Sequence, residues 1–292
     1  MNTFTIGAAT VTRIEEQYGA NFDAKKFFAN WSPGIANEHA SWMVPDHYEP
    51  SSNMLKLSVH SWLIKVGGRT ILIDGCVGND KSRPARPMWD KLKTQYMERF
   101  LATGTKPEAV DLVLCTHLHN DHVGWNTRLV DGKWIPTFPN ARYIWHRADY
   151  DKYKDADPAK EPNNRAAFDD SVRPIVDAGL ADMVTGAHTV NEHLVLEPAP
   201  GHTPGTVAII LASDGARAVF CGDIVHHGIQ IFHPDWNSFA CVDGANAAKS
   251  RHKVLQQASG AGALLMPAHF GAPFVCHVDA KGDAFVPRWG AS

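Results

Sequence analysis

The sequence lacks any long hydrophobic run. Its longest apolar stretch extends from Val207 to Ala212, whereas a helix needs about 20 apolar residues to cross a bilayer. The first residues, MNTFTIGAATVTRIEEQYG, contain no basic segment followed by a continuous apolar core, so we expect no secretory signal. These absences predict a cytoplasmic protein with no membrane partner.

Cysteine is scarce, and basic residues are not in excess. The 292 residues include 5 cysteines, none of them in a CxxC pair, which favours buried free thiols in a reducing compartment over a disulfide framework. Lys and Arg number 28 against 31 for Asp and Glu, and the formal net charge is -3. A nucleic-acid partner is therefore not expected, because such proteins carry clustered basic surfaces.

The chain shows no internal repeat, low-complexity segment or linker that would divide it. We therefore expect a single domain over residues 1–292, since α/β sandwiches of this length often fold as one unit. Pro33, Pro45 and Pro50 interrupt residues 1–55. That part is expected to be an irregular N-terminal extension that acts as a lid or as the contact of a homodimer.

Apolar runs and turn signals predict alternating strands and helices over the rest of the chain. Strands at 57–66 and 70–73 flank a Gly67-Gly68 turn, which is the pattern of a β-hairpin. Further strands are expected at 110–115, 142–145, 194–197, 206–211, 218–221 and 263–266. Helices are expected at 88–101, 147–155, 165–178 and 244–258.

The chain contains 16 histidines, and the spacing of four ligand-type residues is the strongest signal in the sequence. In THLHNDH, which follows the strand at 110–115, His117 and His119 are two residues apart and can present both imidazoles to one ion. Asp121 and His122 come where a helix is expected to begin and can face a neighbouring ion. Imidazole and carboxylate are typical ligands of zinc, and they also suit manganese, iron or cobalt.

These four ligands require partners elsewhere, because a catalytic ion takes about three protein ligands and keeps one open position. Three candidates each follow a later strand: His202 in PGHTPG, Asp223 in FCGD and His269 in MPAH. The order HxHxDH, then His, Asp and a final His, resembles the signature of the metallo-β-lactamase superfamily. The resemblance runs from about Leu57 to the C-terminus.

This resemblance implies an α/β fold, the four-layer αββα sandwich of that superfamily. It also implies two divalent metal ions, with zinc expected first and manganese, iron or cobalt as alternatives. The implied ligands are His117, His119 and His202 for the first ion, Asp121, His122 and His269 for the second, and Asp223 as a bridge between them. Asp74-Gly75 resembles the early Asp-x-Gly turn that lies behind the ligands.

By the same resemblance the chain is a metal-dependent hydrolase. Two neighbouring ions lower the pKa of a bridging water and polarise the carbonyl or phosphoryl oxygen of a substrate. We expect a metal-bridging hydroxide held under Asp223 to attack, while Asp121 helps to return a proton to the leaving oxygen. Asp121 and Asp223 are therefore the expected catalytic residues.

Several segments resemble the quorum-quenching lactonase and methyl parathion hydrolase-like branch of the superfamily. These are DHVGW, PNARYIWHRADY, the helical stretch 160–185, GHTPGT and GAPFVCHVDAKGDAFVP. The resemblance implies a small-molecule lactone or carboxylic ester as substrate, with an organophosphate triester as the second choice. A thioesterase of the glyoxalase II type and a non-catalytic metal-containing metabolite-binding protein stay open as alternative hypotheses.

Aromatic residues and a histidine near the motifs are candidates for contact with the substrate. The alternative for the aromatic residues is a place in the core, because aromatic side chains supply much of the buried area of any fold. His226 follows Asp223 closely and is the candidate for a polar contact, although the alternative is an ordinary loop histidine. The candidates are Trp125, His226, Phe232, Trp236 and Phe270.

Overall fold

The computed structural model describes residues 2–282 and 284–291. The chain divides into two compact units. Unit 1 comprises Met1–Glu16 and Val59–His188, and unit 2 comprises Gln17–Ser58 and Thr189–Ser292. None of the helices in the described part of the chain has the length and apolar character needed to cross a membrane.

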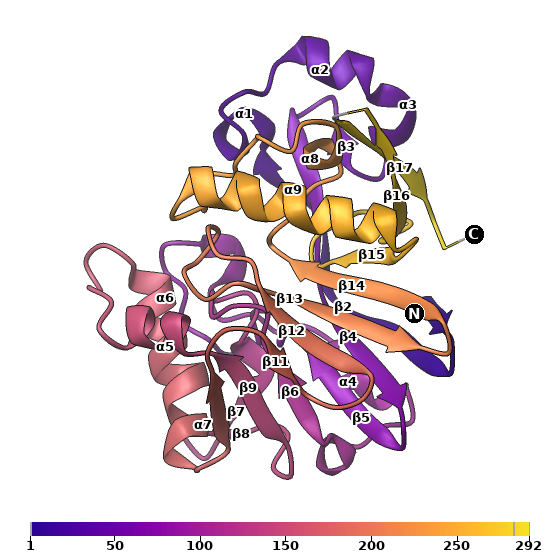
Figure 1. The fold of residues 1–292 in the computed structure, drawn as a ribbon. Helices are drawn as coiled ribbons and strands as arrows, with labels where there is room; N and C mark the ends of the chain where they lie inside the picture. Colours follow the sequence, from indigo (N-terminus) through magenta and orange to yellow (C-terminus); the bar gives the residue numbers. More distant parts are fainter. Residues whose placement is uncertain (1, 283, 292) are drawn as a thin grey trace. The chain divides into compact units, whose positions relative to one another are not determined.

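A mixed sheet forms most of unit 1 (Figure 1), with the strand order β1-β2-β4-β5-β6-β9-β10. The bounds are β1 Asn2–Ile6, β2 Ala9–Asp23, β4 Met54–Val66, β5 Arg69–Ile73, β6 Leu112–Leu114, β9 Arg142–His146 and β10 Ala181–Val184. From β5 to β10 the strands are parallel, and Ile73, Leu114 and Ile144 pair as neighbours at their carboxyl ends. Residues that follow β5 and β6 therefore meet at one edge of the sheet, where ligand sites of parallel sheets are found.

Short helices and a small hairpin complete unit 1. The hairpin consists of β7 Thr127–Val130 and β8 Lys133–Pro136. The helices are η1 Pro87–Trp89, α4 Tyr96–Leu101, η2 Pro107–Ala109, η3 Gly124–Asn126, α5 Arg147–Lys154, α6 Pro162–Ala167, η4 Phe168–Val172 and α7 Arg173–Asp177.

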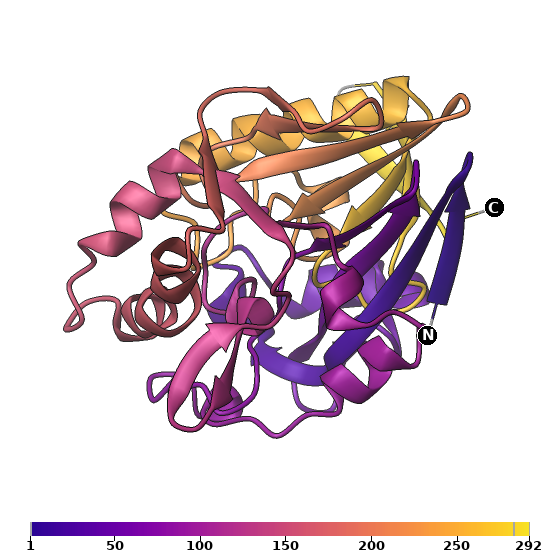
Figure 2. The same ribbon diagram turned by 90° about the horizontal axis from the view of Figure 1, so that it is seen from below.

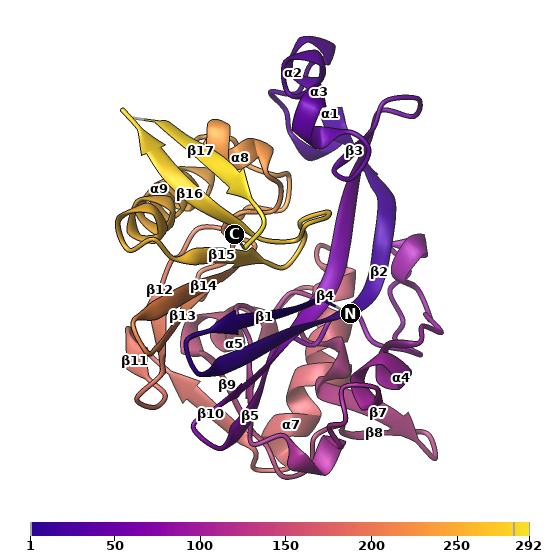
Figure 3. The ribbon, with the colours of Figure 1, turned by 90° about the vertical axis from the view of Figure 1, so that its right-hand side faces the viewer.

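Unit 2 is built on a second sheet, with the strand order β11-β12-β13-β14-β15-β16-β17. The bounds are β11 His188–Thr189, β12 Leu194–Pro198, β13 Val207–Ser213, β14 Ala216–Gly222, β15 Leu264–Pro267, β16 Cys276–Lys281 and β17 Ala284–Trp289. The crossover between the parallel strands β14 and β15 contains α8 Ile229–Phe232 and α9 Gly244–Gly260 (Figure 3). The apolar face of α9 packs on the sheet, because Val254 and Leu255 share a core with Val219 and Leu265.

The expected strands and three of the four expected helical regions are confirmed, but the prediction of an irregular segment at 1–55 is wrong. Residues 2–23 form the hairpin β1–β2, drawn in indigo in Figure 2, which turns at Gly7 with a φ of 58°. The alternation of buried and exposed residues at the start of β2 is a strand signal, which the prolines of the later segment obscured. After β2 come α1 Ala24–Phe27, α2 Pro33–Glu38, α3 Ala40–Met43 and β3 Tyr48–Glu49.

Large apolar residues of this N-terminal segment, most of them aromatic, are part of the core of unit 2. Phe27, Phe28, Trp31 and Met43 are buried in one cluster with Ile229 of α8. Burial of such side chains contributes roughly 1.5–3 kcal/mol each, so the segment is packed as a structural element of unit 2. Its use as a lid or dimer contact stays a prediction.

Two helix predictions are wrong, one at 88–101 and one at the end of the ligand loop, which carries His117, His119, Asp121 and His122. The expected helix at 88–101 is present only as η1 and α4, because Lys91 adopts a φ of 50° and its N–H donates to the carbonyl of Lys81 at 2.7 Å. No helix begins at Asp121 or His122; the chain forms only the short 3-10 turn η3 after them. The ligand loop is therefore held by tertiary hydrogen bonds.

Glu16 holds the residues that follow β5 and the segment that follows His122. It is buried, and its carboxylate accepts hydrogen bonds from Val77 N at 2.8 Å, Gly78 N at 3.1 Å and Trp125 Nε1 at 2.7 Å. Gly124 packs directly against this segment, since a Cβ there would lie 1.8 Å from the Val77 oxygen. The strand β2 is thereby tied to the residues that follow β5 and to those that follow His122.

Glu16 is expected to make stability depend on pH. Burial raises the pKa of its carboxyl from 4.5 to about 7, so between these values the folded state binds the proton more tightly than the unfolded chain. The free energy of unfolding should therefore fall as pH rises from 4.5 to 7, by up to about 3 kcal/mol. Urea unfolding at pH 5 and pH 8 should show a smaller difference in Glu16→Gln than in the native protein.

Glu98→Gln is the control for this experiment, because Glu98 is exposed on α4 in the same unit. It should keep the native pH dependence. An unchanged difference between pH 5 and pH 8 in Glu16→Gln would show that Glu16 is ionised in the folded protein across this range.

Candidate metal centre

The loop after β6 carries the candidate ligands of unit 1, and Asp74 anchors it. Asp74 follows β5, and its carboxylate accepts hydrogen bonds from Thr116 N and Thr116 Oγ1, each at 2.8 Å. The same carboxylate lies 2.9 Å from Nδ1 of His122. Thr116 Oγ1 is also 3.2 Å from Nδ1 of His117. One buried carboxylate therefore fixes the loop and, directly or through Thr116, two imidazole rings, as expected for Asp74-Gly75.

The remaining nitrogen atoms of these histidines lie near the other candidate ligands of the loop. His117 Nε2 is 3.1 Å from His119 Nδ1, and His122 Nε2 is 3.8 Å from Asp121 Oδ2. The rings of His117 and His122 have centroids only 4.0 Å apart, and all four side chains are buried. Unit 1 thus brings together its four predicted ligands, with His117 and His119 as one pair and Asp121 and His122 as another.

In unit 2 the candidate ligands gather around Asp223. This residue follows β14, and its Oδ2 lies 3.1 Å from Nε2 of His202 and 3.1 Å from Nε2 of His226. Its Oδ1 lies 2.9 Å from Nε2 of His269, the residue two positions after β15. The parallel pairing of β14 with β15 explains why Asp223 and His269 meet, since both leave the sheet at the same edge.

The far nitrogen atoms of His202 and His269 also have partners. His269 Nδ1 lies 2.7 Å from the carbonyl oxygen of Ser58 and donates to it. His202 Nδ1 lies 3.7 Å from the thiol of Cys241. Ser238 Oγ lies 3.6 Å from the same thiol and 3.4 Å from His226 Nε2. The contacts of Nδ1 fix the rings of His202 and His269 so that Nε2 of each points at Asp223.

Asp223 also sets the charge of the neighbouring imidazoles. Burial alone would lower the pKa of His202, but the adjacent Asp223 carboxylate outweighs burial and raises that pKa to about 9. For His226, burial outweighs the same carboxylate and lowers the pKa to about 4. Asp223 therefore favours a proton on His202, at a position where a metal ion would supply the positive charge.

The residues present fit divalent metal ions. Buried imidazole nitrogens and carboxylate oxygens form the donor set of zinc and of similar ions. Ligating histidines usually bind through one nitrogen while the other is held by a partner, and His117, His122, His202 and His269 show this arrangement. Each unit therefore carries a preorganised set of candidate metal ligands.

The predicted substrate contacts fall in different surroundings. Trp125 is buried with its ring stacked on Tyr96 at 5.1 Å, and Phe270 is buried in the core of unit 2. Phe232 stacks on Trp42 at 5.6 Å, and Trp236 stacks on His233 at 4.7 Å. His226 alone among these candidates contacts a predicted ligand. Their contact with a substrate stays a prediction.

Two partners of the candidate ligands were not found from the sequence. The first is Cys241, which the sequence indicated only as a free thiol. It contacts His202, which lies 39 positions away in the chain. Ser58 lies 211 positions from His269 and contributes only its backbone carbonyl. Neither contact has a local sequence signal, since backbone carbonyls belong to every residue and the cysteine spacing matches no ligand motif.

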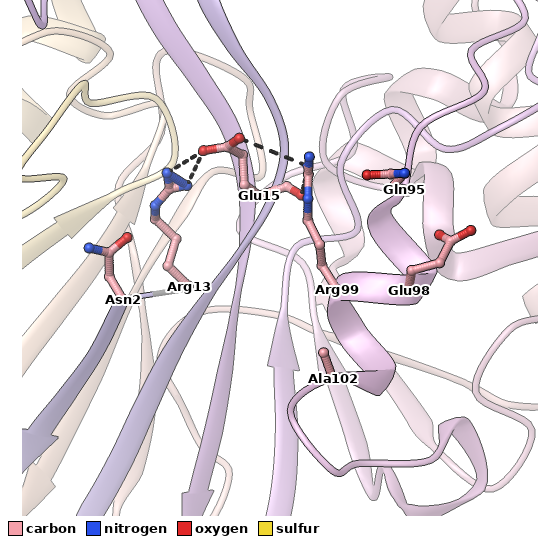
Figure 4. Close-up of a pocket in the computed structure, with 7 residues that line it drawn as sticks. All are labelled: Asn2, Arg13, Glu15, Gln95, Glu98, Arg99 and Ala102. Atoms are coloured by element: carbon pink, nitrogen blue, oxygen red, sulfur yellow. Dashed lines mark hydrogen bonds and ion pairs between the residues drawn. The ribbon is translucent and has the colours of Figure 1, made fainter.

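A pocket of about 390 Å³ in unit 1 contains none of the predicted site residues. Both of its arginines pair with Glu15, which accepts from both terminal nitrogens of Arg13 and lies 3.9 Å from Arg99 (Figure 4). It is lined by Asn2, Arg13, Glu15, Gln95, Glu98, Arg99 and Ala102. The pocket therefore offers balanced charges and no ligand-type cluster.

Cys241 is expected to affect metal binding through His202. Replacement of Cys241 by alanine removes the partner of His202 Nδ1 and frees the ring to rotate, so the affinity for zinc should fall about tenfold. Cys241→Asp, which supplies a stronger acceptor, should restore or raise the affinity. Competition with a chromogenic chelator measures both variants. Equal zinc affinities of Cys241→Ala and the native protein would exclude a positioning role for the thiol.

The profile of the Metallo-beta-lactamase superfamily matches residues 55–269, which include every predicted ligand. The chain therefore belongs to the metallo-β-lactamase superfamily of hydrolases and has its α/β fold, as expected from the ligand motif.

Individual relatives are distant in sequence, and two solved structures are similar in fold. The probable metallo-hydrolase YybB of Bacillus subtilis (strain 168) is 24% identical over 188 residues, covering 64% of this chain and 70% of that protein. The structure of hydrolase AbOPH in the beta lactamase superfamily has a TM-score of 0.81 and 20% identity, covering 99% of this chain and 97% of the other. AidC, a dizinc quorum-quenching lactonase, has a TM-score of 0.77 and 17% identity, covering 100% and 97%.

Proposed function

We propose that the chain is a lactone or carboxylic ester hydrolase with a dinuclear metal centre. The observation that carries this proposal is the geometry of Asp223, whose two oxygens face different imidazoles, Oδ2 toward His202 and Oδ1 toward His269. A carboxylate that bridges two ions presents its oxygens in this way. In the proposal His117, His119 and His202 hold one ion, Asp121, His122 and His269 hold the other, and Asp223 bridges them.

When bound, two zinc ions would lower the pKa of water and polarise the carbonyl of the substrate. The chain's own residues complete the reaction. Asp74 and Thr116 keep the imidazoles of the ligand loop in place, and Asp121 returns a proton to the leaving oxygen. In sum, one water is added: its hydroxyl joins the acyl carbon, the C–O bond breaks, and a proton goes to the leaving oxygen. A lactone becomes a hydroxy acid.

A lactone is the preferred substrate class for two reasons. The sequence segments named above resemble the lactonase branch, and AidC, which shares the fold, is described as a dizinc quorum-quenching lactonase. Organophosphate triesters are the second candidate, because the same ions would polarise a phosphoryl oxygen. A metal-containing protein that binds a metabolite without turnover is the non-catalytic alternative.

A hydrolysis panel tests this function. Zinc-loaded protein is assayed with acyl-homoserine and simple lactones, aryl esters, a phosphotriester, a glutathione thioester and a β-lactam, with a pH indicator as the readout. Lactone turnover that is lost in His117→Ala supports the proposal. Preference for the phosphotriester or the thioester would support the proposed metal centre but change the proposed substrate class. Bound metal with no turnover on any substrate would favour the non-catalytic alternative.

We also propose that the protein works in the cytoplasm on a small molecule. The cysteines Cys76, Cys115, Cys221, Cys241 and Cys276 are free thiols, and all but Cys241 are buried, which suits a reducing compartment. A homodimer is proposed as the oligomeric state, as is common for soluble enzymes. Sedimentation of the metal-loaded protein at several concentrations tests the dimer.

A further inference from the structure

The two residues that lie between the ligands of the HxHxD motif are each held by a helix of unit 1. The backbone N of Leu118 donates to Oδ2 of Asp149, a fully buried residue of α5, at 3.0 Å. The side-chain Nδ2 of Asn120 donates to Oδ1 of Asn164 in α6 at 3.0 Å. Since α5 and α6 are neighbours in the fold (Figure 1), one pair of helices contacts the ligand loop at both positions that the motif leaves unspecified.

A chain of hydrogen bonds extends from Asn120 to a charged pair at these helices. Asn164 Nδ2 donates to Oε2 of Glu161 at 3.2 Å, and Lys152 Nζ donates to Oε1 of the same carboxylate at 2.9 Å. Burial would raise the pKa of Glu161, but the hydrogen bonds from Lys152 and Asn164 outweigh burial and lower that pKa. Glu161 is therefore ionised and can only accept hydrogen bonds.

The charge of Glu161 fixes the orientation of both amides. Because an ionised carboxylate only accepts, Asn164 turns its NH2 toward Glu161 and its oxygen toward Asn120. That oxygen in turn requires the NH2 of Asn120. Each amide thus has a single orientation, and Asn120 is only 8% exposed. The hydrogen bonds therefore restrict rotation of the ligand loop at Asn120.

We propose that Asn120 and Asn164 are positioning residues of the metal centre, through which α6 holds one ligand of each ion in place. This inference rests on the proposed dinuclear centre. Asn120 stands directly between His119, a proposed ligand of the first ion, and Asp121, a proposed ligand of the second. A rotation of the loop at Asn120 would displace both ligands, so the amide pair acts on both ions at once.

Removal of the Asn164 amide tests this positioning. Asn164→Leu keeps the size of the side chain but cannot accept from Asn120, so zinc affinity should fall about tenfold, the lower end of the range for groups that orient ligands. In cobalt-substituted protein the visible absorption bands, which report the coordination of the metal, should shift. Asn140→Leu is the matched control, because the Asn140 amide donates to the carbonyl of Glu108 at 2.8 Å in the same unit. It should keep the native affinity and bands.

A reversed pair separates the hydrogen bond from the shape of the side chain. In Asn164→Asp, repulsion by Glu161 turns the new carboxylate away from Asn120, so zinc affinity should fall as it does in Asn164→Leu. Addition of Glu161→Gln exchanges donor and acceptor between the two positions and should restore the native affinity and bands. If the double variant binds zinc as weakly as Asn164→Asp, the hydrogen bond to Asn120 does not position the ligands.

The metal measurements separate this inference from the proposed function, because neither needs turnover. The expected changes in zinc affinity and cobalt bands, with no lactone or ester hydrolysed by the native protein, would overturn the proposed function and retain the positioning role. Lactone turnover by the native protein, with native affinity and bands in folded Asn164→Leu and Asn164→Asp, would do the opposite. Lower thermal stability alone would also overturn the positioning role, since the amide pair would then serve only the packing of the loop.

Discussion

Asp223→Asn is expected to reduce hydrolysis by about 10²- to 10³-fold, the range for removing one group that stabilises the transition state. Asp223 is buried, and its two oxygens lie within 3.1 Å of His202 and His226 and 2.9 Å of His269. Asparagine keeps the shape but removes the negative charge and turns one acceptor into an NH2 donor. Both changes oppose a cation at this position. The measurement is kcat/KM together with the zinc content of the purified variant.

Asp235→Asn is the matched control for this substitution. Asp235 also pairs with a histidine, since its Oδ1 lies 3.2 Å from His252 Nε2, but its side chain is 84% exposed. Because an exposed ion pair contributes little, this variant should keep native activity and zinc content. Native activity in Asp223→Asn would remove Asp223 from the reaction and with it the proposed bridge.

Asp74→Asn is expected to weaken zinc binding about 10- to 100-fold, although Asp74 itself is not a proposed ligand. Its carboxylate accepts from Thr116 N, Thr116 Oγ1 and the ring of His122 at 2.8, 2.8 and 2.9 Å. An amide offers one acceptor oxygen and turns an NH2 donor toward groups that also donate. Imidazoles of the ligand loop would then lose their fixed orientation. Competition with a chelator measures the zinc affinity.

Asp111→Asn tests whether the loss of zinc affinity is specific to Asp74. Asp111 lies in the same unit, and its carboxylate likewise accepts from a backbone N–H, that of Thr70 at 2.8 Å, and from Arg69. It does not touch the ligand loop, so zinc affinity should stay native. Circular dichroism checks that both variants fold. If the folded Asp74→Asn protein binds zinc as tightly as the native protein, Asp74 does not position the ligands.

Local patterns were sufficient to predict the elements that carry the candidate ligands. The apolar strands before the ligand loop and before Asp223 are present as β6 and β14, because a run of apolar residues bounded by turn signals is buried in a sheet in most contexts. The same approach was wrong for residues 1–55. There the prolines are compatible with the strand ends and short helices of the structure, so they did not mark an irregular segment.

The sequence by itself determined which side chains are suited to metal ions and which superfamily the chain belongs to, because ligand chemistry and short spacing are properties of neighbouring residues. Only the tertiary structure decided what orients those side chains. Cys241 reaches His202 across 39 positions, Ser58 reaches His269 across 211, and Glu16 reaches Trp125 across 109. Such contacts depend on the strand register and on the path of each loop, which arise from the packing of distant segments and leave no periodic signal in the chain.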